Sequence, residues 1–225
     1  MLRAKSEEEL LEGVCQTAVE QGGFRLAWVG LCREDPDKTV EPVAWAGPAT
    51  DYLEGLHVTW ADSPEGQGPT GRAIREGRPV AAQNITGDPD YAPWRETALK
   101  HGFRASLALP LRMGETVGGA LNLYASEPFA FSDQEVDLLS ELASDLAYGI
   151  QYRRTETAYR QQAAQTAKAL EGTVRALAQV TEYSDPYTAG HQGRVAELAR
   201  AIADTLGRDR EAAWGVEMGA WVHDI

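Results

Sequence analysis

The 225-residue chain contains little cysteine and no long apolar segment. With only Cys15 and Cys32, a disulfide scaffold is not expected, and a reducing cytoplasm is the default location. No apolar run approaches the roughly 20 residues that cross a bilayer. The charged N-terminus, MLRAKSEEELLEGV, also lacks the apolar core of a secretory signal. We therefore expect a cytoplasmic protein without membrane contacts.

Positive charge is scarce in the first two thirds of the sequence. Residues 1–150 contain 12 Lys or Arg and 24 Asp or Glu, whereas residues 151–225 contain 9 and 10, so the net charges are −12 and −1. An acidic surface repels phosphates, so we expect no nucleic acid polymer as a partner. The asymmetry also indicates two units, as the usual size of domains allows.

Short apolar segments and helix signals alternate over residues 1–150. A capping box at Ser6 and Glu9 predicts a helix that ends near Gly22. Strands are expected at residues 24–31, 39–45, 79–84, 105–111 and 117–124, helices at 68–77 and 94–101, and a short segment at 56–60. Hairpins outnumber strand-helix-strand units, which predicts an α+β fold: an antiparallel sheet with helices packed on it.

A single long helix is predicted from Ser132 to Tyr183. Ser132 and Glu135 form a second capping box, and no proline occurs between Ser132 and Pro186. At about 1.5 Å per residue, this helix is longer than a small domain is wide, so it needs a partner.

The apolar stripe of this long helix changes frame near Gly149. The first part of the stripe contains Leu139, Ala143, Leu146 and Ile150. A second seam with more small and polar residues runs at 4-3 spacing from Tyr152 to Val180. We expect a parallel homodimer through the second seam.

Residues 6–151 resemble a GAF domain. The segments that match the family in order are GFRLAWVG (23–30), GPTGRAI (68–74), GRPV (77–80), SLALPL (106–111), GGALNLY (118–124) and FSDQE (131–135). The resemblance implies an antiparallel sheet with flanking helices. It does not specify a ligand, because GAF domains bind cyclic nucleotides, bilins, haem or small metabolites.

Aromatic side chains with a few polar groups are typical of small-ligand sites. We therefore expect a pocket for an unknown small molecule among Trp60, Tyr91, Trp94 and Arg104. The glycines of residues 66–71 lack the lysine of a phosphate-binding loop.

Residues 168–225 resemble the beginning of an HD-GYP domain, a family that hydrolyses cyclic di-GMP at a metal centre. The matching segments are DPYTAGHQ (185–192), RVA (194–196) and VHDI (222–225). The resemblance implies that His191, His223 and Asp224 are ligands of a two-metal site of the iron or manganese type. Tyr187 stands where some relatives carry a glutamate linked to a third metal.

Three ligands do not complete a two-metal site. The family takes its other ligands, and its Gly-Tyr-Pro motif, from segments further along the chain. We therefore expect this chain to be catalytically inactive and to hold no metal. It would be the sensory and regulatory part of a bacterial protein whose complete form hydrolyses cyclic di-GMP.

The expected organisation is a GAF sensory domain at residues 6–151, a long signalling helix at 132–183 and an incomplete, all-helical HD-GYP domain at 168–225. Two alternatives remain open. One is a non-enzymatic GAF module for ligand binding or dimerisation. The other is a fragment of a different HD-superfamily phosphohydrolase that acts on a nucleotide.

Overall fold

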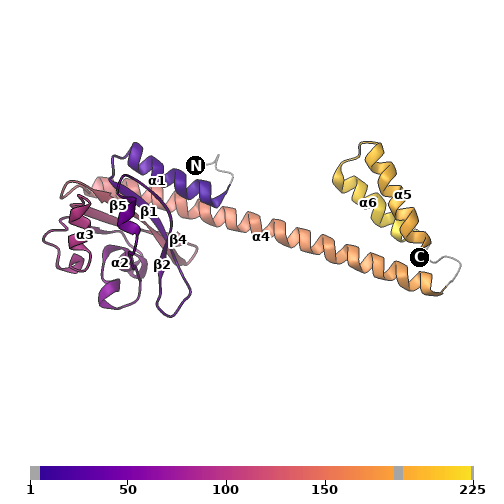
Figure 1. Cartoon of the computed structure of the whole chain (residues 1–225), viewed down its shortest axis with the longest axis horizontal. Coiled ribbons are helices and arrows are strands. Elements are labelled where there is room, and N and C mark those ends of the chain that lie inside the picture. The colour runs from indigo at the N-terminus through magenta and orange to yellow at the C-terminus, as the bar shows by residue number, and fades with distance from the viewer. Residues whose placement is uncertain (1–5, 185–189, 224–225) are drawn as a thin grey trace. The chain divides into compact units, whose positions relative to one another are not determined.

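The computed structural model describes residues 6–184 and 190–223 and divides into two compact units, Met1–Thr155 and Glu156–Ile225. Helix α4 (Asp133–Ser184) begins in the first unit and ends in the second (Figure 1). None of the described helices combines the length and apolar character that a membrane span requires.

The first unit is built on a five-stranded antiparallel sheet, which confirms the expected α+β fold. Its strands are β1 (Leu26–Cys32), β2 (Val40–Ala46), β3 (Val80–Ala82), β4 (Ala105–Met113) and β5 (Thr116–Ala125), in the order β2-β1-β5-β4-β3. All five expected strands are present, and only β3 is clearly shorter than its sequence pattern. The expected short segment at 56–60 contributes one isolated bridge, between Thr39 and Thr59.

Helices α1 (Glu7–Glu20) and α4 cover one face of this sheet (Figure 1). The buried side chains there are almost all aliphatic, among them Leu10, Val29, Leu121 and Leu146. The N-cap predicted at Ser6 is confirmed, since the Glu9 amide donates to Ser6 Oγ at 3.1 Å. This face is a dry, close-packed core.

The opposite face is covered by α2 (Pro69–Glu76), α3 (Arg95–Lys100) and three short 3₁₀ helices, η1 (Thr50–Leu53), η2 (Pro64–Gly66) and η3 (Pro89–Tyr91). Its buried cluster is rich in aromatic side chains, which are Trp28, Tyr52, Tyr91, Phe103 and Tyr124. Because strand side chains alternate between faces, Trp28 lies on this side while Val29 lies on the aliphatic side.

The long helix predicted from Ser132 to Tyr183 is confirmed as α4, with both ends shifted by one residue. Its first apolar stripe is buried on the sheet, while the second seam, after Gly149, is exposed at Tyr152, Tyr159 and Leu170. A Cβ at Gly149 would lie 2.7 Å from a Leu10 methyl carbon, so the glycine lets α1 pack closely. The shift in apolar spacing near Gly149 therefore marks the boundary between the buried and the exposed apolar stripe of α4.

The second unit contains the end of α4 with α5 (His191–Thr205) and α6 (Arg210–Trp221). Arg175 of α4 lies over the Trp221 ring, with the guanidinium carbon 5.4 Å from the ring centre. Glu217 pairs with Arg200 at 3.2 Å and with Arg175 at 3.6 Å. Several apolar side chains of α5 and α6 remain exposed, namely Leu198, Ile202, Leu206 and Val216.

Candidate functional site

The aromatic face of the sheet encloses a small cavity in the first unit. Its volume is about 30 Å³, room for roughly two water molecules. Strands β1, β4 and β5 form its floor, and α2, η1 and η3 supply its walls. The principal lining residues are Trp28, Tyr52, Leu56, Thr70, Tyr91, Trp94, Ser106, Asn122 and Tyr124.

Cross-strand pairing places the polar groups of the floor. Trp28 of β1 and Asn122 of β5 are opposite each other, as are Ser106 of β4 and Tyr124 of β5. Thr70, at the start of α2, donates from Oγ1 to Asn122 Oδ1 at 2.7 Å. This buried hydrogen bond ties α2 to the centre of the sheet.

Three tyrosines approach one another within the cavity. The ring centres of Tyr52 and Tyr124 are 5.5 Å apart, and Tyr91 lies within interaction range of both. Burial raises the pKa of all three phenols above its ordinary value. The hydroxyls therefore stay neutral and can both donate and accept hydrogen bonds.

Two polar atoms of the floor lack a hydrogen bond of good geometry within the described part of the chain. They are Nε1 of Trp28 and Oγ of Ser106, both buried. Trp28 lies near the Tyr124 hydroxyl and Ser106 near the Tyr91 hydroxyl. Buried donors and acceptors of this kind are satisfied by water or by a ligand in most proteins.

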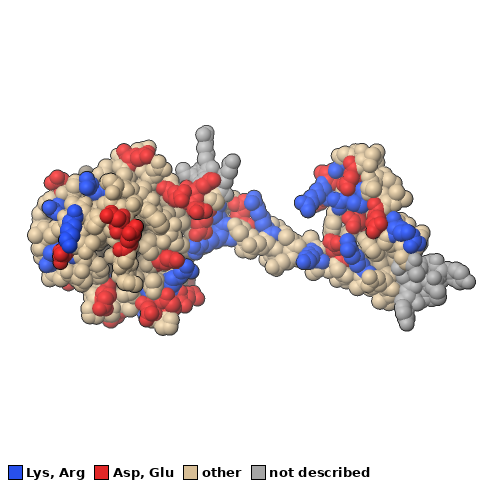
Figure 2. All heavy atoms as spheres, in the orientation of Figure 1, with Lys and Arg blue, Asp and Glu red and all other residues tan. Residues whose placement is uncertain are grey.

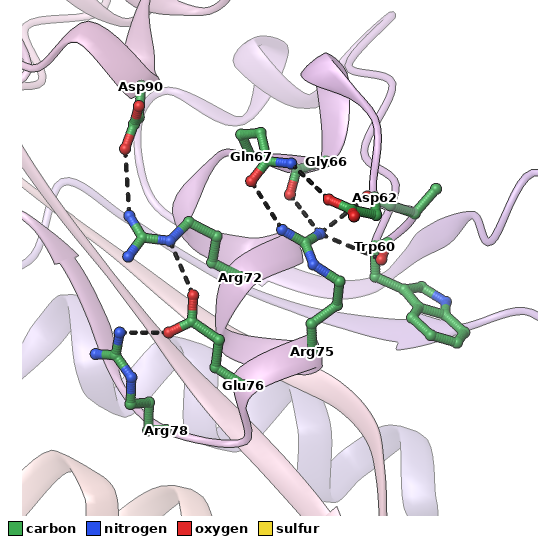
Figure 3. A network of polar contacts seen from close by, with 10 residues as sticks. Trp60, Asp62, Gly66, Gln67, Arg72, Arg75, Glu76, Arg78 and Asp90 are labelled. Atoms are coloured by element: carbon green, nitrogen blue, oxygen red, sulfur yellow. Dashed lines mark hydrogen bonds and ion pairs between the residues drawn. The ribbon is translucent and has the colours of Figure 1, made fainter.

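The loop over residues 60–67 contributes Glu65 to the lining and is held by Arg75 of α2 (Figure 3). Its Nη1 donates to the carbonyl oxygens of Ala61 and Gly66 at 2.9 and 2.7 Å, and Nη2 donates to Gln67 Oε1 at 3.0 Å. A Cβ at Gly71 would lie 2.3 Å from Gly66 O, so the loop needs glycine there. Gly66 and Gly71 therefore permit close packing of backbone segments. This role agrees with the sequence, in which residues 66–71 lack the lysine of a phosphate-binding loop.

A second set of arginine contacts holds the loop that carries Tyr91. Arg72 of α2 donates to Asp90 Oδ2 at 3.3 Å (Figure 3), and Arg95 donates to the carbonyl oxygens of Ile85 and Asp88 at 3.1 and 2.6 Å. The guanidinium groups therefore brace the walls from outside. No Lys or Arg occurs among the described residues that line the cavity.

The structure brings together two of the four expected ligand-binding residues. Tyr91 and Trp94 line the cavity, with ring centres 5.9 Å apart. Trp60 and Arg104 do not line it. Lys38 Nζ lies 4.5 Å from the centre of the Trp60 ring, and Arg104 Nη1 donates to Phe103 O at 3.2 Å, so local contacts account for both.

Sequence reasoning missed Tyr52, Tyr124 and Asn122 as lining residues. Asn122 is a polar residue inside an apolar strand, and Tyr124 lies two residues further on the same face, so alternation indicated both. Tyr52 lies in η1, whose sequence has no regular apolar pattern, and its position depends on tertiary packing.

Of the two cysteines, Cys15 is buried and Cys32 is partly buried. Burial raises the pKa of the Cys15 thiol to about 12 and that of Cys32 to about 11. Both are free thiols, so neither is poised as a nucleophile at neutral pH.

In the second unit, two of the expected metal ligands lie close together. They are His191, the first residue of α5, and His223, which follows α6. The ring centres of His191 and His223 are 5.4 Å apart. His223 Nδ1 lies 2.8 Å from Ala220 O, a contact that orients Nε2 as the ligating atom in many metal sites. Asp224 lies outside the described residues, among which no group of three metal-binding side chains occurs.

The family model of the GAF domain matches residues 4–151. The chain belongs to the GAF domain family. GAF domains are typical of bacterial signalling proteins. A comparison with curated proteins finds no match. No match supports the HD-GYP resemblance of residues 168–225, which stays a prediction.

Solved structures share the GAF fold with this chain. The GAF domain of a Coxiella burnetii phosphoenolpyruvate-protein phosphotransferase matches with TM-score 0.57 and 19% identity, over 70% of this chain and 89% of its own. Free methionine-R-sulfoxide reductase of Neisseria meningitidis, solved with its substrate, matches with TM-score 0.57 and 18% identity, over 69% and 84%.

The second GAF domain of DevS from Mycobacterium smegmatis matches with TM-score 0.52 and 19% identity, over 68% of this chain and 99% of its own. At these identities the likeness shows the fold alone.

Proposed function

We propose that the chain is the sensory part of a bacterial signalling protein, and that a small uncharged molecule binds in the aromatic cavity of its GAF domain. The main support for this proposal is the chemistry of the side chains that line the cavity. Neutral tyrosine hydroxyls, an indole N–H and a serine hydroxyl lie among aromatic rings, without a lysine or arginine. Small-ligand sites have this composition of apolar walls and a few convergent polar groups.

The lining disfavours anionic ligands. A phosphate or carboxylate buried in the cavity would find no cation there, and the charged side chain that lines it is Glu65. Burial of an unpaired charge is costly, so we expect cyclic nucleotides to bind poorly. The volume of about 30 Å³ admits a few heavy atoms, and a larger ligand requires the loop held by Arg75 to move.

Thermal shift and tryptophan fluorescence test this proposal. The probes are phenol, indole and benzamide, with cyclic GMP and inorganic phosphate as anionic comparators. We expect at least one uncharged probe to stabilise the chain, with the effect lost in Trp94→Ala and retained in Trp45→Ala, whose side chain is half exposed and outside the cavity. Stabilisation by the anions alone would contradict the proposal.

Helix α4 is the proposed route of the signal and the proposed dimer seam. Its exposed stripe over 152–180 gives the helix a face for a second copy, and helices in proteins are stabilised mainly by the packing of such a face. Ligand binding would bias the packing of this seam only through a difference in affinity between two states.

Cysteine substitution tests the parallel seam. Leu170→Cys lies in the seam and Lys168→Cys lies two residues away, on another face of the helix. In a parallel dimer, mild oxidation cross-links two copies through the Leu170→Cys variant and much less through the control. Equal cross-linking of both, or a monomer in sedimentation, would contradict the seam.

We further propose that residues 168–225 begin an HD-GYP domain and that the complete form hydrolyses cyclic di-GMP. Support comes from the DPYTAGH motif, its spacing to His223 and Asp224, and the 5.4 Å between the two imidazoles. With metal–nitrogen bonds of about 2.0–2.1 Å, imidazoles on one ion have ring centres roughly 5 Å apart. His191 and His223 would hold the metal with Asp224, and the bound metal would supply an activated water for phosphodiester cleavage.

We expect no turnover of cyclic di-GMP by this chain, because its described residues bring together two of the three implied ligands. Elemental analysis after exposure to Mn²⁺ or Fe²⁺, with His191→Ala as comparator, tests the metal proposal. Metal retained by the wild type and lost in the variant would support it. Absence of tightly held metal from both forms agrees with the expectation that this chain holds none. Metal bound equally by both would contradict a role for His191 as a ligand and favour a non-enzymatic GAF module, with the cavity proposal unaffected.

A further inference from the structure

A groove in the first unit, distinct from the aromatic cavity, runs between helix α1 and strand β2. Its volume is about 580 Å³. The α1 side is formed by Glu8, Glu12, Gln16, Val19 and Glu20, and the β2 side by residues 43–47.

Strand β2 is an edge strand, and part of its outer edge is open. It pairs with β1 on one side and stands at the end of the sheet order. Its start is covered, because the Val40 amide donates to Val58 O at 2.8 Å and Thr39 bridges Thr59. Pro42 has no amide to donate. Residues 43–47 are therefore the part of the edge where another extended chain can add.

The charge of the groove is of one sign. Three carboxylates, those of Glu8, Glu12 and Glu20, line it together with no Lys or Arg. Among the described residues, no basic side chain forms an ion pair with these three. Acidic groups are also dispersed over the visible face of this unit (Figure 2).

The negative charge of the groove determines which kind of partner can bind there. A second copy of the first unit is an unfavourable partner, because residues 1–150 carry a net charge of −12 and the edges would bring two acidic helices together. Trp45, half exposed beside the groove, offers an aromatic anchor of the type enriched in interfaces. A basic, extended segment meets each of these features.

We propose that this groove binds an extended segment of a partner protein, rich in lysine or arginine. The segment adds to β2 along residues 43–47 as a further strand, and its basic side chains lie against Glu8, Glu12 and Glu20. Residues 43–47, the end of β2 and the glycine that follows it, span roughly 16 Å at about 3.3 Å per residue, enough for a short strand.

A synthetic peptide tests the proposal on the full chain. The probe is acetyl-Lys-Val-Lys-Val-Lys-Val-Lys-amide, and binding is followed by calorimetry and by amide exchange. We expect binding that weakens with salt, and slower exchange at residues 43–47. The double variant Glu12→Lys with Glu20→Lys is expected to bind roughly tenfold more weakly.

Two controls separate the proposal from unspecific attraction. Glu115→Lys with Glu127→Lys changes the net charge equally at exposed sites outside the groove, so it should bind within about twofold of wild type. The same peptide with N-methylated valines keeps its charge but cannot donate those amides to β2. Equal losses in both double variants, unchanged binding of the methylated peptide, or no binding of the parent peptide would each overturn the proposal.

Discussion

The two faces of the sheet differ in chemistry although the same five strands form both. Towards α1 and α4, the buried side chains are nearly all aliphatic, and none of the described side chains there has a buried polar atom without a hydrogen bond. Towards α2 and η3, the core contains tyrosines, Ser106, Thr70 and Asn122 around a cavity. The first face contributes stability through close packing, whereas the second is less completely packed and contains the cavity that we propose as a ligand site.

The largest effect is expected for Leu146→Ala on the aliphatic face. Leu146 is fully buried on α4, and its truncation removes apolar contacts and leaves a cavity. We expect the free energy of unfolding to fall by about 2–5 kcal/mol, measured by chemical denaturation. A loss below about 1 kcal/mol would show that this face does not dominate stability.

Arg75→Met on the aromatic side comes next. The variant removes the donors to Ala61 O, Gly66 O and Gln67 Oε1, and we expect a loss of about 1–3 kcal/mol with faster amide exchange over residues 60–67. Arg78→Met is the matched control, because its partner Glu76 is on the surface, and it should cost less than about 0.5 kcal/mol. Equal effects would contradict the bracing role.

A contrast of similar size is expected between two hydroxyls of the cavity. Thr70→Val removes the buried hydrogen bond to Asn122 and should cost about 1–3 kcal/mol. Ser106→Ala removes a hydroxyl without a hydrogen bond of good geometry, so stability should change by less than about 0.5 kcal/mol. A large loss in Ser106→Ala would show that the hydroxyl is bound, for example to cavity water.

The smallest effect is expected for Glu135→Gln at the start of α4. Hydrogen bonds from Ser132 lower the pKa of this carboxyl, so its contribution is present above the pKa in the unfolded chain. The contribution is lost as pH falls through the lower pKa of the folded chain. The destabilisation by Glu135→Gln should therefore be measurable at pH 7 and absent at strongly acidic pH. A loss independent of pH would contradict this cause.

Local patterns predicted most of the elements. The two capping boxes start α1 and α4 where Ser6 and Ser132 predicted, and the apolar runs became the five strands. Such patterns suffice because caps, periodicity and turns act over a few residues. The change of stripe near Gly149 also corresponds to a real boundary between buried and exposed parts of α4.

The candidate site was only partly predictable. Tyr91 and Trp94 were expected on composition, whereas Trp60 and Arg104 have the same chemistry but local contacts that keep them out of the lining. Tyr52 joins the cavity from a segment with no regular pattern. Membership of a cavity depends on which distant segments meet, and composition does not encode that.

By itself, the sequence determined the α+β architecture, the length of α4 and the acidic character of the first unit, because these follow from short-range patterns and from counting charges. Only the tertiary structure decided which tyrosines converge and which strand edge stays open beside α1. These features join residues far apart in the chain, and their positions are fixed by packing between elements rather than within them.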